Sequence, residues 1–158
     1  MTRSPFAINV REAPAYVVPV KELVTVLARA EQTGGAFGLL EGRLTRGADP
    51  PPHVHHREDE SFFILDGTLG VRVGDDSFTA VPGSFVYCPQ GVPHALEVES
   101  DEVRLLTFIT PGGLEPFFVE LGEPAPDRTL PAVPPEADIQ RIVTLAGHYG
   151  VEVLTDWP

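Results

Sequence analysis

The sequence of 158 residues has little of several residue types, and each shortage excludes a class of protein. Cys88 is the only cysteine, so no disulfide framework within the chain is possible and a reducing compartment is expected. No apolar run approaches the roughly 18 residues of a membrane span. The first residues after Met1 also lack the apolar core of a signal peptide. We therefore expect a cytoplasmic protein with no membrane partner.

Basic residues are also scarce, with 11 lysines and arginines against 23 acidic residues and a formal net charge of −12. Such a charge repels a phosphate backbone, so nucleic acid is not expected as a partner. The patterns G-x-S-x-G, G-x-G-x-x-G and the phosphate-binding loop do not occur. With 42% apolar residues, the chain is typical of one globular domain over residues 1–158.

Turn-forming residues are abundant, and they define the fold class. The 15 glycines and 17 prolines leave no room for a bundle of long helices. Between them lie short segments rich in β-branched and aromatic residues, which predict an all-β sandwich or barrel over about residues 20–110. The predicted strands are Glu22–Leu27, Phe37–Thr45, Ser61–Leu65, Leu69–Val73, Ser77–Ala80, Ser84–Tyr87, His94–Val98 and Val103–Ile109.

The pattern changes after Thr110, so residues 111–158 are predicted to form an appendage with short helices. Gly113–Leu121 has helical spacing interrupted early by Pro116, and Asp138 is a candidate cap for a helix that stops near Gly147. Glu123–Pro135 contains five prolines and is expected to be extended. Val151–Leu154 is either a last turn or a short edge strand. We expect Phe117, Phe118 and Leu121 to cover an open end or side of the barrel, or alternatively to line a lid over its cavity.

Four of the five histidines lie between positions 53 and 94. His53 and His55 are two residues apart and would share one face of a strand. Glu60 opens the next strand and His94 opens a later one, so these four side chains are candidates for a metal site. Imidazole and carboxylate suit first-row divalent metals, and four ligands leave positions open for water, dioxygen or substrate.

The alternative is that these histidines are packed or hydrogen-bonded without a metal. His56 points away from the pair and His148 lies in the tail, so neither is included in the site. Cys88 has no C-x-x-C partner and is expected to be buried packing.

The spacing around these residues follows two glycine-framed motifs. Residues 47–67 fit G-x5-H-x-H-x4-E-x6-G, and residues 83–94 fit G-x5-P-x-G-x2-H, with fifteen residues between them. The chain thereby resembles the cupin superfamily, in particular its small single-domain members. The resemblance implies a jelly-roll β-barrel that holds one divalent transition metal (Fe, Mn, Ni, Co or Cu) through His53, His55, Glu60 and His94. One position departs from the pattern, because Val98 stands where the second motif usually ends in Asn.

Other stretches are similar to bacterial quercetin 2,3-dioxygenase-like proteins. These are Pro52–Gly67, Pro93–Ala95 and Gly112–Gly122. The resemblance implies a metal-dependent dioxygenase that opens a ring of a flavonol or another enolic small molecule, with Glu60 as the proton acceptor. Two alternatives stay open. In the first alternative, the protein binds a small molecule at its metal without turnover. In the second, it is a scaffold with no metal.

Other residues are interpreted as structural, in the core, at the surface or at a dimer interface. The inward positions beside the site would be apolar: Leu40, Leu44, Phe62, Ile64, Leu96 and Val98. Core packing is expected for Tyr16, Phe37, Phe85, Tyr87 and Phe108. Solvated surface is expected for Glu58, Asp59, Glu97, Glu99, Asp101 and Glu102. The segment Ala13–Leu27 is apolar enough to pair with a partner's sheet, which predicts a homodimer.

Overall fold

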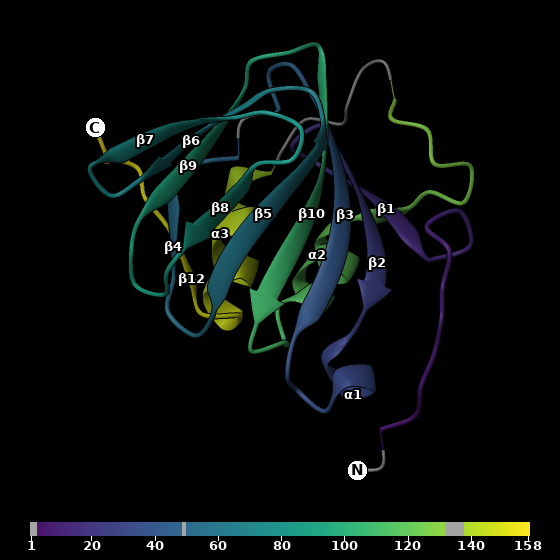
Figure 1. Ribbon diagram of the computed structural model, residues 1–158. Coiled ribbons are helices and arrows are strands. Elements are labelled where there is room, and N and C mark those ends of the chain that lie inside the picture. Colours follow the sequence, from purple (N-terminus) through teal and green to yellow (C-terminus); the bar gives the residue numbers. More distant parts are fainter. Residues whose placement is uncertain (1–2, 49, 132–137) are drawn as a thin grey trace.

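The computed structural model describes residues 3–48, 50–131 and 138–158, and it contains two antiparallel sheets (Figure 1). The larger sheet has seven strands in the order β11-β1-β2-β3-β10-β5-β8. Their bounds are Glu123–Pro124 (β11), Ala15–Val18 (β1), Glu22–Ala28 (β2), Gly38–Thr45 (β3), Glu102–Thr110 (β10), Asp59–Asp66 (β5) and Phe85–Cys88 (β8).

The smaller sheet has five strands in the order β12-β4-β9-β6-β7. Their bounds are Val151–Val153 (β12), His53–His55 (β4), His94–Val98 (β9), Leu69–Val73 (β6) and Asp76–Ala80 (β7). The predicted all-β jelly roll with short helices is therefore confirmed. One detail differs: within the described ranges no strand pairing joins the two sheets, so the barrel is not fully closed.

Each of the predicted strands is present, with bounds shifted by two residues or fewer. The tail also forms an edge strand, β12, which pairs with β4. The sequence did not indicate β1 or β11 as separate strands, because each is very short and lies among prolines. Their strand character comes from pairing with each other and, for β1, with β2.

Three short helices accompany the sheets: α1 (Ala30–Thr33), α2 (Glu115–Leu121) and α3 (Ile139–His148). Pro116 lies in the first turn of α2, where its missing N–H leaves no helical hydrogen bond unmade. Asp138 caps α3 as predicted, since its Oδ1 accepts a hydrogen bond of 3.0 Å from the Arg141 backbone N–H. The proline-rich segment is described only as far as residue 131, so the prediction for residues 132–135 lies outside the described residues.

Buried side chains form two main apolar clusters. The first lies between strands of both sheets and includes Leu44, Phe62, Ile64, Leu69, Val71, Val98, Val103 and Leu105. The second joins the sheets to α2 and α3 and includes Val18, Val24, Val26, Leu40, Ile109, Leu114, Leu121, Ile142, Ala146 and Val151. The helices therefore close one end of the sandwich with apolar side chains.

Two aromatic residues contradict the prediction of core packing. Phe85 is 61% exposed and Tyr87 is 51% exposed. Both lie on the edge strand β8, where alternation turns Val86 and Cys88 inward and the two aromatics outward. Tyr16, Phe37 and Phe108 are partly buried.

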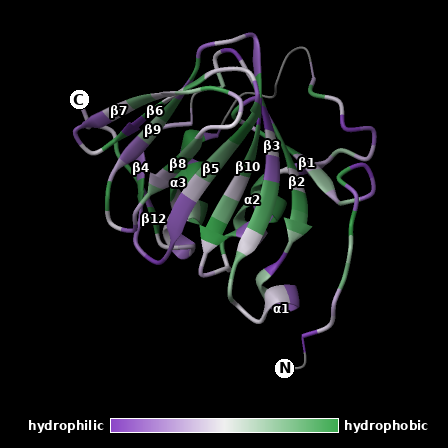
Figure 2. Ribbon diagram, in the orientation of Figure 1, coloured by the Kyte–Doolittle hydropathy of each residue, from purple (hydrophilic) through white to green (hydrophobic). Residues whose placement is uncertain are grey.

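Hydropathy differs between neighbouring strands, since β2 is mostly hydrophobic whereas β3 also carries hydrophilic residues (Figure 2).

The segment Ala13–Leu27 pairs within its own chain. It supplies β1 and most of β2, and β1 is flanked by β2 and β11. Exchange with a partner is therefore not needed to satisfy its backbone, and the homodimer stays a prediction. No helix in the described part of the chain is long and apolar enough to cross a membrane.

Candidate metal centre

Three strands bring four side chains together at one point between the sheets. His53 and His55 come from β4 and His94 from the neighbouring β9, where His53 and His94 stand opposite each other. Glu60 comes from β5 in the other sheet. One ligand atom from each residue lies within 4.8 Å of the others, so the four predicted residues form a cluster that could hold a metal ion.

The three imidazoles converge on one carboxylate oxygen. The Nε2 atoms of His55 and His94 are each 3.0 Å from Glu60 Oε2, and His53 Nε2 is 3.8 Å from the same atom. His55, Glu60 and His94 are buried, and the side chain of His53 is 16% exposed. The cluster is therefore largely shielded from bulk water, and His53 is its most exposed member.

Hydrogen bonds on the far side of two rings fix which nitrogen faces the cluster. His53 Nδ1 donates to the Pro51 carbonyl at 2.8 Å, and His55 Nδ1 donates to Glu58 Oε1 at 2.9 Å. With a proton held on Nδ1, Nε2 is the nitrogen that can bind a metal in the neutral ring.

Glu58 is a residue that the sequence reasoning missed. It was expected to be solvated, but it is only 5% exposed because its carboxylate turns back to His55. Its position three residues after a candidate ligand was the available signal. The other acidic residues mostly agree with expectation, since Glu97, Glu99 and Asp101 are exposed.

A buried ring nitrogen without a hydrogen-bond partner indicates that these four residues fit a divalent metal. His55 Nε2, which faces the cluster, is buried and makes no well-aligned hydrogen bond. Such orphaned polar atoms are costly in a protein interior unless another group binds them. Three imidazoles and one carboxylate also leave a bound dication with one compensating charge and open coordination positions.

The charges of the cluster are strongly coupled. Burial acts to lower the pKa of His55, but attraction to Glu60 and Glu58 raises it to about 10. Burial likewise acts to raise the pKa of Glu60, yet the neighbouring histidines hold it well below its usual value. For His53, burial prevails and lowers the pKa. Glu60 is therefore a carboxylate, and positive charge is favoured beside it.

The other two histidines lie apart from the cluster, and Cys88 is its neighbour but not one of its candidate ligands, as predicted. His56 is exposed, and its Nε2 lies 2.8 Å from Glu152 Oε2. His148 is exposed at the end of α3. Cys88 is a free, buried cysteine opposite Glu60 on β8, and burial raises the pKa of its thiol.

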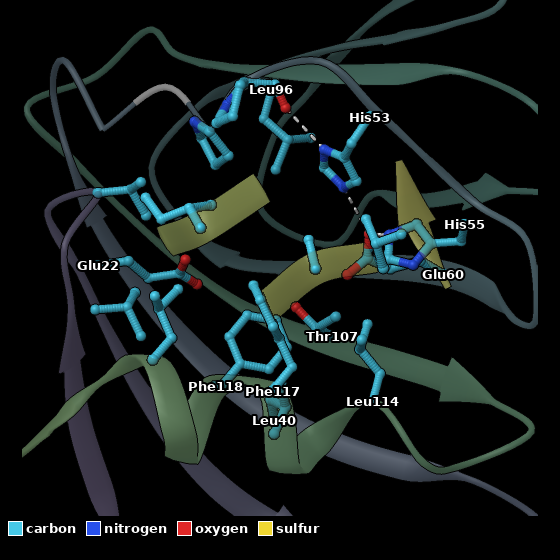
Figure 3. A pocket seen from close by; sticks show the side chains of 18 of the residues that line it. Glu22, Leu40, His53, His55, Glu60, Leu96, Thr107, Leu114, Phe117 and Phe118 are labelled. Atoms are coloured by element: carbon cyan, nitrogen blue, oxygen red, sulfur yellow. Dashed lines mark hydrogen bonds and ion pairs between the residues drawn. The ribbon is translucent and has the colours of Figure 1, made fainter. Parts of the chain in front are cut away.

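An apolar cavity of about 110 Å³ adjoins the cluster (Figure 3). One water molecule needs roughly 10–15 Å³, so the cavity has room for a small molecule. Of the predicted inward residues, those on its wall are Leu40, Leu44, Phe62 and Leu96. Ile64 and Val98 are instead buried in the first apolar cluster. Val98, opposite Leu69 on β6, is buried as predicted but does not line the cavity.

The appendage takes part in the cavity. Phe117, Phe118 and Leu121 of α2 line it, together with Ile142 of α3 and Val151 of β12. These α2 residues cover one side of the cavity, and no lid movement is tested by the structure. Their spacing on one helix face was the signal, but the sequence did not indicate what they would face.

Comparison with known proteins agrees with the two motifs and their geometry. Residues 40–110 match the family described as Cupin domain, and this range contains all four clustered residues. The matched range is slightly less than half of the chain. An RmlC-like cupin from Shewanella frigidimarina has the same fold, with a TM-score of 0.63 and 15% identity over 74% of this chain and 99% of that one.

Two further relatives show the range of cupins that this chain resembles. Quercetin 2,3-dioxygenase of Bacillus subtilis is 25% identical over 77% of this chain, which spans only 36% of that enzyme's length. The polyketide cyclase RemF from Streptomyces resistomycificus has a similar fold, with a TM-score of 0.59 and 20% identity over 68% of this chain and 80% of that one. The chain therefore has a cupin-like fold and is similar to quercetinase-like proteins, and the fold alone does not specify the reaction.

Proposed function

We propose that this cupin is a metal-dependent dioxygenase acting on a flavonol or another small molecule with an enolic hydroxyl. One observation carries the proposal: three imidazole Nε2 atoms surround Glu60 Oε2 at the wall of an apolar cavity. The similarity to a quercetin 2,3-dioxygenase supports this class of substrate. We assign the metal to His53, His55, Glu60 and His94, one ion per chain.

A bound divalent transition metal supplies a Lewis acid for the enolic oxygen and redox chemistry toward dioxygen. The protein supplies the rest. His53 and His55 keep fixed ring orientations through Pro51 and Glu58. The apolar wall excludes water and holds the flat body of the substrate against Phe117 and Phe118.

Glu60 has a second proposed role, as acceptor of the substrate's hydroxyl proton. It is a carboxylate, and its Oε2 lies at the centre of the cluster beside the cavity, within reach of a bound hydroxyl. Loss of that proton converts the enol to an enolate, the electron-rich form that reacts with dioxygen.

The proposal is tested by metal analysis combined with an oxygen electrode. Protein purified without added metal is analysed for Fe, Mn, Ni, Co and Cu, then supplied with flavonols and diketones. We expect oxygen uptake that requires both metal and substrate, and that a His94→Ala variant lacks. Saturable binding without oxygen uptake would instead favour a binding protein, and absence of both metal and binding would favour a scaffold.

We also propose that the protein is a homodimer. Size-exclusion chromatography coupled to light scattering measures its mass directly, and a monomer at working concentration contradicts this proposal without affecting the metal site.

A further inference from the structure

A second carboxyl group faces the cavity away from the metal cluster. Glu22 opens β2, where alternation points Glu22, Val24 and Val26 to the interior and Leu23 to the other face. Figure 3 shows the Glu22 carboxyl on the other side of the cavity from Glu60 and His55. Glu22 is thus the one acidic residue on the described cavity wall that does not belong to the metal cluster.

The fold leaves room for this side chain. Gly42 on β3 lies beside it, and a Cβ at that position would stand 2.8 Å from Glu22 Oε1 and 3.2 Å from Leu105 Cδ1. Any larger residue at position 42 would displace the carboxyl or the leucine. The space above Gly42 is therefore occupied by Glu22.

No described residue satisfies the Glu22 carboxyl through a hydrogen bond or ion pair. Burial, with a smaller effect from the charge of Glu60, raises its pKa to about 8. At neutral pH the group is mainly a neutral carboxylic acid, which can donate one hydrogen bond and accept another. Glu22 is half-buried and its carboxyl has no partner among the described residues, so it can bind a group inside the cavity.

We propose that Glu22 is a specificity-determining residue that binds a neutral hydroxyl group at the end of the ligand remote from the metal. This inference rests on the proposed function, which places the enolic end of the ligand at the metal cluster. It narrows the ligand class to a molecule with an apolar middle and polar groups at both ends. An anionic group at the remote end is disfavoured, because a carboxyl on an apolar wall offers it no positive partner.

The test compares two flavonols that differ only in remote hydroxyl groups. 3-Hydroxyflavone carries the chelating hydroxyl and ketone and no other hydroxyl, whereas 3,7,4′-trihydroxyflavone adds one on each outer ring and no catechol. Binding to Ni²⁺-loaded protein is followed by the absorbance of the flavonol without oxygen, so that affinity is measured apart from turnover. The proteins are the wild type, Glu22→Leu, Glu22→Gln and the control Glu12→Leu, which changes an exposed glutamate.

We expect the wild type and Glu12→Leu to bind the trihydroxy compound more tightly, by about fivefold to tenfold, the value of one hydrogen bond. Glu22→Leu should lose this preference and keep its affinity for 3-hydroxyflavone. Glu22→Gln, which keeps a donor and an acceptor, should retain most of the preference.

Two different results would overturn the inference. If Glu22→Leu keeps the preference, or loses affinity for both compounds equally, Glu22 does not select the remote hydroxyl although the flavonol class stands. If the wild type binds neither flavonol, the ligand class of the proposed function fails, and the role of Glu22 fails with it. Melting curves of all four proteins establish that each is folded.

Discussion

At the scale of single residues, glutamates that look alike in the sequence differ in burial and ionisation because their spatial neighbours differ. Glu58 and Glu97 both lie in acidic stretches, yet Glu58 is buried against His55 and Glu97 is exposed on β9. Glu60 and Glu22 both face the cavity, but one is held ionised by histidines and the other is held neutral by burial. Their chemistry follows from their neighbours.

Glu60 is expected to be required for turnover more than for binding. A Glu60→Gln protein keeps the shape of the side chain but cannot accept a proton, so we expect oxygen uptake with a flavonol to fall by about 10²–10⁴-fold. Metal content and flavonol affinity are measured in parallel. Normal binding with undiminished turnover would remove the proposed role as base.

Glu58 is expected to control metal affinity without being a ligand. Glu58→Ala frees the His55 ring to rotate, and loss of such an orienting partner typically weakens metal binding by about 10–100-fold. Titration with a competing chelator measures the affinity, and Glu97→Ala is the matched control on an exposed glutamate. Equal affinities of the two variants would show that the hydrogen bond to His55 is dispensable.

Glu22 is expected to make stability depend on pH. Its pKa is about 8 in the folded protein against an ordinary value of 4.5, so the folded state holds a proton that the unfolded state releases. This contribution is fully present below about pH 4.5 and is lost as pH rises through about 8.

Denaturant unfolding of Glu22→Gln and wild type, both with the same metal, isolates the effect. The free energy of unfolding of the wild type should fall relative to the variant between pH 5 and 8. A constant difference across this range would mean that Glu22 titrates normally.

At the scale of elements, a buried carboxylate joins the turns around α1 and α2. Glu115 is 1% exposed, and it accepts hydrogen bonds from the Ala30 and Gly113 backbone N–H groups at 2.5 and 2.6 Å. Gly38 at the start of β3 leaves the space for it, because a Cβ there would lie 2.4 Å from Glu115 Cδ. The position of α2, and hence of Phe117 and Phe118, depends on this contact.

Two glycine-to-alanine substitutions should therefore have opposite effects. Gly38→Ala crowds a carboxylate that is already bonded, and we expect a loss of about 1–3 kcal/mol in the free energy of unfolding. Gly147→Ala lies on an open face of α3 and should gain about 0.5–1 kcal/mol, because alanine favours helix. Denaturant titration measures both. A tolerated Gly38→Ala would mean that Glu115 can move without cost.

At the scale of the whole molecule, the metal cluster links the two sheets. His53, His55 and His94 belong to the five-stranded sheet and Glu60 to the seven-stranded one. No strand pairing joins these sheets in the described residues, so a metal ion at this point would act as a cross-link between them.

Metal removal is therefore expected to lower thermal stability. A metal that binds only the folded state stabilises it by about 2.7 kcal/mol at a free concentration 100 times its Kd. Differential scanning calorimetry before and after dialysis against a chelator measures the shift, which readdition of metal should reverse. His94→Ala, which lacks one ligand, should melt at a temperature that the chelator changes little. A shift of the same size in both proteins would argue against this site.

The sequence by itself determined the strand positions and the candidate ligands. Short apolar segments between glycines and prolines predict strands from local physics, and the two motifs fix the spacing of His53, His55, Glu60 and His94. The single-domain limits, the cytoplasmic location and the homodimer stay predictions.

Only the tertiary structure decided which side chains meet. Glu22 and Glu60 lie 38 positions apart, and Phe117 lies farther still from both, so no local pattern relates them. They share one cavity because β2 and β5 belong to the same sheet and α2 packs over its end. The exposure of Phe85 and Tyr87 and the burial of Glu58 have the same origin, because the surroundings of a side chain are made by strands remote in the chain.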